Sequence, residues 1–162
     1  MNSASTPRNF CIVGPIQAHG KADHREPQGY RTEISQVVLE LFPNCVQFHP
    51  DQKVTQIASR ILSSRKQGDS PAELDIAAIK EEFLLATKKV GNCELVVGYL
   101  PLGTLSMGTA MELYAAHLGG AHTVLVSENT ENLALVSTVS KFVPDLKSLE
   151  RYLRETFFCL KD

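Results

Sequence analysis

The sequence predicts an α/β fold, a single domain in which a doubly wound parallel sheet of four to five strands carries helices on both faces. Short apolar runs rich in β-branched residues alternate along the chain with longer amphipathic segments. Because parallel neighbours in a sheet need a crossover connection, strands and helices alternate in such folds. The 162 residues, 43% of them hydrophobic, suffice for one domain with a sizeable core.

The first half of the chain supplies two strands and one helix. Residues 1–8 are polar, and we expect a flexible tail there. The run at 9–16 predicts a buried strand, and the polar stretch 17–29 predicts a long loop. Residues 30–42 place apolar side chains at helical spacing, and 45–50 form a second short strand.

The second half adds helices and further strands. Helical spacing of apolar residues predicts helices over 54–62 and 76–90. The run 93–100 is the most strand-like of the chain, and a helix over 106–120 and a strand over 122–127 follow it. The remainder reads as a helix or short strand, a break at Pro144-Asp145 and a closing helix.

A sheet of this Rossmann-like or flavodoxin-like kind binds ligands at its carboxyl edge, near the point where the strand order reverses. The loops expected at that edge are 17–29, the region of Pro50, 101–105 and 128–132. We therefore expect functional side chains in these loops and in the helices that follow them.

Composition and charge exclude several classes of protein. The formal net charge of −2 gives no basic excess for binding a nucleic acid polymer or an anionic membrane. The N-terminal residues lack the cationic start and apolar core of a signal peptide, and no apolar run is long enough to span a membrane. We therefore expect a cytoplasmic protein.

The cysteines and histidines form no metal or redox motif. Cys11, Cys45, Cys93 and Cys159 lie far apart without a C-x-x-C pair, and we expect buried thiols in a reducing compartment. The five histidines show neither H-x-x-x-H nor H-E-x-x-H spacing, so we expect no metal site.

A single acid, Glu112, stands in the apolar and small-residue stretch 106–120, where a bare charge is costly. On a helix it shares a stripe with Ala115, Ala116 and Gly119, small residues that leave room for a ligand to approach the carboxylate. An acid near a helix start is also favoured by the helix dipole alone. The residue pattern leaves both interpretations open.

Ser106 lies six residues before Glu112, at the expected N-cap of the same helix, with Gly108 between them. A hydroxyl among the unpaired amides of a helix start is suited to bind a phosphate. Plain capping explains the same residue.

The stretch VVGYLPLGTLSMGTAMELYAA resembles the nucleoside 2-deoxyribosyltransferase family, in which an apolar strand and a variable loop lead into a helix bearing G-x-x-x-E-L-x-x-A. Here that motif is Gly108, Glu112, Leu113 and Ala116. Weaker matches at CIVGPI, at FHPD and over residues 131–153 extend the resemblance to most of the expected domain, 9–162.

The resemblance implies an enzyme that cleaves an N-glycosidic bond, with Glu112 as its catalytic residue. A carboxylate held against the anomeric carbon of the sugar either attacks it or stabilises the oxocarbenium-like charge while the base leaves. Family transferases carry an aspartate at the position of Ser106, for the sugar 5′-hydroxyl, whereas the nucleotide hydrolase branch carries a serine for a 5′-phosphate. An aspartate would repel that dianion, and a hydroxyl can donate to it. The chain is therefore most similar to the 5′-monophosphate N-glycosidase branch, which needs no metal or organic cofactor.

The resemblance also implies the substrate-binding residues. One group would line the phosphate and base pockets, and a second group lies in segments that family members lend to a neighbouring subunit, which implies at least a homodimer with shared active sites. Each residue also has an ordinary alternative role: a solvated loop charge, a helix anchor, a strand-end hydrogen bond, core packing or a local cap. The first group is Gly14, Ile16, Gln17, His19, Gly20, Tyr30, Arg31, His49, Ser106, Gly108 and Met111; the second is Asn132 and Ser137.

One position departs from the family. Members place an aspartate shortly before the strand that precedes the motif, where it assists proton transfer to the base, and that register falls on Ala86, Thr87 and Lys88 here. Glu94 is the nearest carboxylate, but its spacing differs. A base that can be protonated from solvent would relieve the need for the aspartate.

The leading hypothesis is hydrolysis of a nucleoside or 2′-deoxynucleoside 5′-monophosphate to the free base and a sugar 5-phosphate. One alternative is a 2-deoxyribosyltransferase acting on free nucleosides. Two non-catalytic alternatives are a nucleotide-binding sensor on the same fold and an interaction domain without a ligand.

Overall fold

The computed structural model describes residues 5–15, 28–50, 53–54, 56–57, 73–104, 106–128, 130 and 132–158. Its centre is a single parallel sheet whose strands follow the order β2-β1-β3-β4-β5. All neighbouring strands are parallel, and β1 and β3 pair from Phe10 with Leu95 to Val13 with Gly98. The strands are β1 (Asn9–Val13), β2 (Val46–Phe48), β3 (Leu95–Tyr99), β4 (His122–Val126) and β5 (Lys141–Val143).

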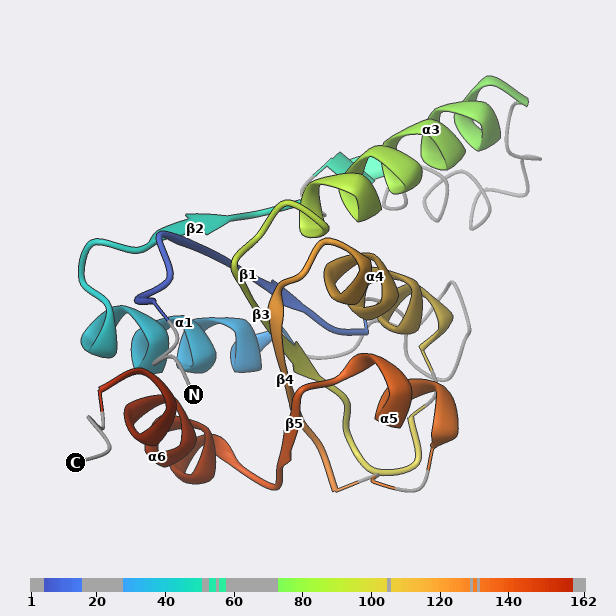
Figure 1. Ribbon diagram of the computed structural model, residues 1–162. Coiled ribbons are helices and arrows are strands. Elements are labelled where there is room, and N and C mark those ends of the chain that lie inside the picture. The colour runs from blue at the N-terminus through green and yellow to red at the C-terminus, as the bar shows by residue number, and fades with distance from the viewer. Residues whose placement is uncertain are drawn as a thin grey trace.

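Helices cover both faces of the sheet, as the alternation of segments predicts. Figure 1 shows α1 and α6 packed together on one face and α4 and α5 on the other, while α3 packs on α4 and projects beyond the sheet. The helices are α1 (Gly29–Leu41), α3 (Glu73–Val90), α4 (Met107–Leu118), α5 (Leu133–Thr138) and α6 (Leu146–Phe157). The predicted α/β fold is therefore confirmed, with five strands.

The core has two halves because side chains of a strand point alternately to the two faces of a sheet. Phe10 and Ile12 of β1 pack with α1 and α6, whereas Cys11 and Val13 pack with Leu113 of α4 and the end of α3. Every residue of β1 from Phe10 onward is buried, which explains why this strand reads as a continuous apolar run rather than an alternating one.

Three helices begin at residues whose side chains accept backbone hydrogen bonds. Ser106 caps α4, Asn132 caps α5 and Asp145 caps α6, each accepting from an amide two or three residues further on. These caps fix where each helix begins after the preceding strand or loop.

The structure refines several predicted elements. The segment left open as a helix or short strand contains both, α5 and then β5. Of the helix expected over 54–62, only residues 54 and 56–57 are described, and these are helical; residues 58–72 lie outside the described residues. Pro7 is buried, and Arg8 donates from its backbone and its guanidinium to Glu94, so part of the stretch expected as a tail contacts the domain.

The cysteines within the described residues are buried thiols, as expected. Cys11, Cys45 and Cys93 are buried thiols outside any disulfide, and Cys159 lies outside the described residues. Burial, followed by the charge of Glu94, raises the pKa of the Cys45 thiol to about 11. In the described part of the chain, no helix has the length and apolar character needed to cross a membrane.

Candidate functional site

The strand order reverses between β1 and β3, so the carboxyl ends of these two strands mark the place where a ligand is expected. Gly14 follows β1 and lies directly against Tyr30 of α1. A β-carbon placed on Gly14 would stand 2.4 Å from the Tyr30 hydroxyl oxygen. The Tyr30 ring is buried and stacks on Tyr99, the last residue of β3, with 4.4 Å between ring centroids. Tyr30 therefore anchors α1 to the sheet, the ordinary role weighed for it above.

Arg31 is held beside this aromatic pair by a short network. Its Nη1 donates to the carbonyl of Ile12 at 2.8 Å, and its Nε donates to the Gln28 side-chain oxygen at 2.7 Å. Gln28 in turn donates to the carbonyl of Pro15 at 3.0 Å. The guanidinium is only half-buried and lies 5.4 Å from the centroid of the Tyr30 ring. A fixed positive charge therefore stands at the end of β1.

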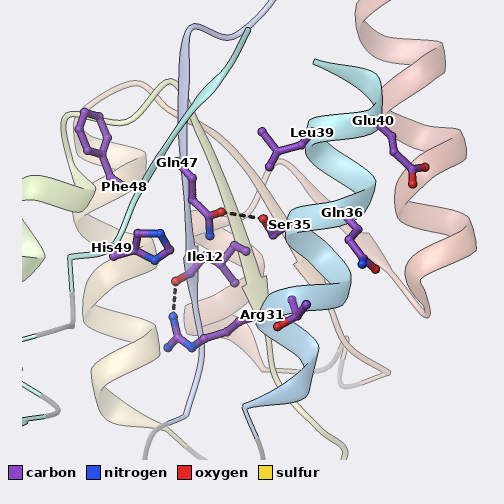
Figure 2. Close-up of a pocket in the computed structure, with 10 residues that line it drawn as sticks. Ile12, Arg31, Ser35, Gln36, Leu39, Glu40, Gln47, Phe48 and His49 are labelled. Carbon is purple, nitrogen blue, oxygen red and sulfur yellow. Dashed lines mark hydrogen bonds between the residues drawn. The ribbon is translucent and has the colours of Figure 1, made fainter. Parts of the chain in front are cut away.

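A groove of about 480 Å³ lies between α1 and β2 and contains two of the predicted site residues, Arg31 and His49. Figure 2 shows Arg31 and His49 at one end of it and Glu40 at the other, with Ile12, Leu39 and Phe48 also lining it. The hydroxyl of Ser35 donates to the side-chain oxygen of Gln47 at 2.6 Å across the groove. The volume is within the range of small-molecule sites, about 300–1,000 Å³.

Glu112 lies on the opposite face of the sheet, in the second turn of α4. Its residue is only 7% exposed, and it shares the buried face of the helix with Thr109, Leu113 and Ala116. The first turn of α4 contains no acidic residue. Because the effect of the helix dipole falls off within the first turn, the dipole does not account for a carboxylate at this depth.

Ser106 is the N-cap of α4, which confirms the capping role that the sequence offered for it. Its hydroxyl oxygen accepts from the Thr109 amide at 3.2 Å and from the Thr109 hydroxyl at 2.8 Å. The amides of Met107 and Gly108 begin the helix, where backbone donors lack an intrahelical acceptor. Capping leaves the hydroxyl proton of Ser106 to donate to an anion at this helix start.

Gly108 of α4 packs against a neighbouring helix, whereas Met107 and Met111 are exposed. Gly108 lies against Phe83 of α3, since a β-carbon there would meet that ring at 3.5 Å. Core packing, the alternative role of Met111, is wrong, because Met111 lies with its neighbour Met107 on the solvent side of α4. The helix is turned so that Glu112 and Leu113 face the sheet, and Met111, predicted to line the substrate pocket, points away from that face.

Asn132 and Ser137 both make local hydrogen bonds on α5. The Asn132 side chain accepts from the amides of Ala134 and Leu135 at 3.1 and 3.2 Å, and the Ser137 hydroxyl donates to the carbonyl of Ala134 at 2.9 Å. Ser137 is exposed. Its surface position is compatible with a role toward a second subunit.

Several predicted positions lie outside the described residues or carry no acid. Ile16, Gln17, His19 and Gly20 lie outside the described residues. In the register where the family aspartate falls, Ala86 is buried and the Thr87 hydroxyl donates to the carbonyl of Phe83. Glu94 is bound to Arg8, which holds the pKa of its carboxyl below the usual range.

The structure thus brings Gly14, Tyr30 and Arg31 together and places Arg31 and His49 in one groove. Ser106 and Glu112 both belong to α4, on the other face of the sheet. The sequence interpretation missed Gln28 and Tyr99. Tyr99 lies one residue before the end of the predicted strand 93–100, at the expected ligand-binding edge, a signal that was present in the pattern. Gln28 sat in an expected loop and had no such signal. Among the residues that the structure describes, no group of three His, Cys, Asp or Glu side chains gathers where it could hold a metal ion.

Comparison with known proteins bears on the fold. No protein-family model matches the sequence, and no curated protein does. Among solved structures, the chain is similar to a 2-deoxyribosyltransferase from the psychrotolerant bacterium Bacillus psychrosaccharolyticus, with a TM-score of 0.51 and 18% sequence identity. The alignment covers 89% of this chain and 91% of that one. At this identity the similarity establishes a shared α/β fold.

Proposed function

We propose that this protein hydrolyses the N-glycosidic bond of a nucleoside or 2′-deoxynucleoside 5′-monophosphate, giving the free base and a sugar 5-phosphate. The observation that carries the proposal is the burial of Glu112. The Glu112 residue is 7% exposed in the second turn of α4, where the helix dipole contributes little to stabilising a carboxylate. A role in binding or catalysis explains why the chain has an acid there.

Glu112 would act at the anomeric carbon of the sugar. Its ionised oxygen either attacks that carbon, forming a glycosyl-enzyme that water then hydrolyses, or stabilises the positive charge that develops as the base leaves. Both roles need the carboxylate shielded from bulk water, because electrostatic stabilisation is stronger where water is excluded. The burial of Glu112 supports either one.

The start of α4 would hold the 5′-phosphate. The hydroxyl of Ser106 and the amides of Met107 and Gly108 are donors at a helix N-terminus, where a phosphate is favoured by geometry and by the helix dipole. An aspartate in place of Ser106 would repel the phosphate. The half-buried Arg31, which is bonded to the end of β1, adds a positive charge to the carboxyl edge of the sheet.

The leaving base would take its proton from water in this mechanism. The register of the family aspartate holds Ala86, Thr87 and Lys88, and Thr87 is already bonded to its own helix. We therefore expect the rate to depend on the basicity of the leaving base, and bases that are readily protonated to leave fastest.

A transferase that moves 2-deoxyribose between bases is the second candidate. The fold similarity to a protein described as a 2-deoxyribosyltransferase favours it. Ser106 argues against the transferase. A transferase of this family has an aspartate here to bind the sugar 5′-hydroxyl, whereas the neutral hydroxyl of a serine is better suited to bind a 5′-phosphate. We further propose a cytoplasmic enzyme that is at least a homodimer, with Ser137 completing the site of a neighbouring subunit.

The test is base release from a panel of nucleoside and 2′-deoxynucleoside 5′-monophosphates, measured for the natural protein and for Glu112→Gln. We expect the substitution to lower the rate by about 100-fold or more, as removal of a covalent or charge-stabilising group does. Glu155→Gln, an exposed acid on α6, is the matched control and should keep full activity. Thermal unfolding of both variants checks that they fold.

Three results would separate the candidates. A loss of less than about tenfold in Glu112→Gln contradicts the catalytic assignment. Base exchange between an unphosphorylated deoxynucleoside and a second base, with no hydrolysis of monophosphates, favours the transferase. Tight nucleotide binding without base release favours a non-catalytic sensor.

A further inference from the structure

The strand β2 forms one edge of the sheet. In the part of the chain that the structure describes, it pairs with β1 alone. The Val46 amide donates to the carbonyl of Arg8, so the main chain of Val46 bonds toward β1. Successive residues of a strand direct their main-chain groups to opposite sides. The N–H and C=O of Gln47 therefore face the outer side of β2, where an added strand would bond to them.

Apolar side chains lie on both faces of this edge. The side chain of Gln47 accepts from Ser35 of α1, so Val46 and Phe48 point to the opposite face. Figure 2 shows the Phe48 ring directed away from α1, and the two residues are 57% and 47% exposed. On the α1 side, the exposed Leu39 lines the groove of about 480 Å³ described above. Because its side chains alternate between two faces, an extended peptide would contact both apolar surfaces.

The charge at one end of the groove sets the direction of such a peptide. Arg31 donates to the carbonyl of Ile12 near the end of β1, and His49 follows β2 at the same end of the groove. A peptide strand parallel to β2 would end here, and its terminal carboxylate would be attracted to the guanidinium. An antiparallel strand would bring its terminal ammonium to Arg31, which repels it. A parallel strand with a free carboxyl end therefore fits the groove.

We propose that the groove between α1 and β2 binds the carboxyl-terminal end of a partner peptide. The peptide adds to β2 as a parallel strand, bonds to the main chain of Gln47 and places its carboxylate at Arg31 and His49. An apolar residue at its end packs on Leu39. Strand addition and capture of a terminal carboxylate are both recurring modes of peptide recognition. Glu112 lies on the other face of the sheet, so the proposal does not rest on the glycosidase activity.

The first test compares two forms of one probe, a fluorescein-labelled peptide of sequence GTVTV with either a free or an amidated carboxyl end. Fluorescence anisotropy measures their affinities for the natural protein. We expect the free acid to bind about tenfold more tightly, because only a carboxylate forms a charged hydrogen bond with the guanidinium. Arg31→Gln should abolish this difference. Equal affinities for the natural protein, or no saturable binding of the free acid, would overturn the proposal.

The second test changes the wall of the groove. Leu39→Glu should weaken binding of the free acid by about tenfold, because it removes an apolar contact and adds a negative charge near the carboxylate. Leu85→Glu on α3 is the matched control, since Leu85 is 41% exposed and Leu39 36%, and it should bind like the natural protein. Thermal unfolding checks that both variants fold. Unchanged binding in Leu39→Glu contradicts the proposal. Base release by Leu39→Glu should equal that of the natural protein, so each activity is measured separately.

The third test distinguishes a peptide strand from other occupants. Two further peptides each carry one methylated amide, the last or the one before it. Only one of these N–H groups can face β2, so the two peptides should differ by roughly three- to tenfold in affinity. Equal affinities of the two would overturn the proposal. It would also be overturned by acetyl-valine binding as tightly as the peptide, which identifies a small organic acid, or by displacement of the probe by a nucleoside monophosphate, which assigns the groove to the substrate. A natural dimer that Leu39→Glu dissociates would identify a second copy of the chain instead.

Discussion

At the scale of single residues, the close approach of Gly14 to Tyr30 joins the end of β1 to the start of α1. The absence of a side chain at Gly14 lets the Tyr30 ring lie over the backbone there, and the stack on Tyr99 fixes that ring from the other side. The ring cannot move aside cheaply, because it is buried. This contact sets the position of Arg31, the next residue along α1.

Gly14→Ala should therefore destabilise the protein by about 1–3 kcal/mol, the usual cost of overpacking a rigid site. Urea unfolding measures the change. Gly29→Ala is the control, since a β-carbon there meets nothing within 4 Å, and its stability should be unchanged or slightly higher. Equal stabilities of the two variants would show that Tyr30 yields to the extra methyl group.

At the scale of elements, α4 combines roles that a sequence pattern cannot separate. Its N-cap satisfies the helix start, one side buries Glu112 against the sheet, and the other side exposes a stripe of apolar residues from Met107 to Leu118. The sequence identified the helix, its cap and its acid. It misplaced Met111, because methionine is common in cores and is equally suited to an exposed binding surface.

The cap of α6 gives a prediction about a whole element. Asp145 accepts from the Ser148 amide at 2.7 Å, and that hydrogen bond holds the pKa of the Asp145 carboxyl below its usual range. A lowered pKa in the folded state contributes stability above the unfolded pKa, about 3.9, that is lost as the pH falls through the folded value. Asp145→Ala should lower the midpoint of thermal unfolding at neutral pH by a few degrees.

Asp145→Asn separates the cap from the charge. Asparagine is an equally good N-cap, so this variant should stay close to the natural protein at neutral pH and lose less stability on acidification. A loss in Asp145→Asn as large as in Asp145→Ala would mean that the charge, rather than the cap, stabilises α6.

At the scale of the whole molecule, His122 joins the sheet to the helical layer. It begins β4, its Nε2 lies 2.9 Å from the hydroxyl oxygen of Tyr152 on α6, and its ring packs against Tyr152 and Phe157. Burial lowers the pKa of the His122 imidazole, because it disfavours the charged form. The neutral ring is therefore the form that the folded protein prefers.

The free energy of unfolding should accordingly fall as the pH drops below about 6.5, where the unfolded chain takes up a proton on this histidine before the folded protein does. His122→Phe should flatten that slope between pH 7.5 and 5.5 in denaturant unfolding. Tyr152→Phe should keep it, because burial rather than the hydrogen bond lowers the pKa. An unchanged slope in His122→Phe would assign the pH dependence to other groups.

The sequence by itself determined the elements and their arrangement to a large extent. Apolar period and turn residues are local properties, and they predicted the first four strands and the N-cap at Ser106, while the segment of α5 and β5 stayed open as a helix or short strand. The parallel sheet followed because alternating strands and helices permit few other connections. The chemistry at Glu112 was open, since an acid near a helix start has an ordinary explanation in one dimension.

Only the tertiary structure decided which side of each helix is buried and which residues meet. It excluded the dipole as the reason for Glu112 by placing that acid in the second turn and out of water, and it turned Met107 and Met111 to the surface. It also joined Tyr30 to Tyr99 and Gln28 to Arg31, pairs that no sequence period connects. The physical reason is that burial and contact depend on how a helix is rotated against the sheet, and that rotation is set by packing across the whole domain rather than by the residues of one segment.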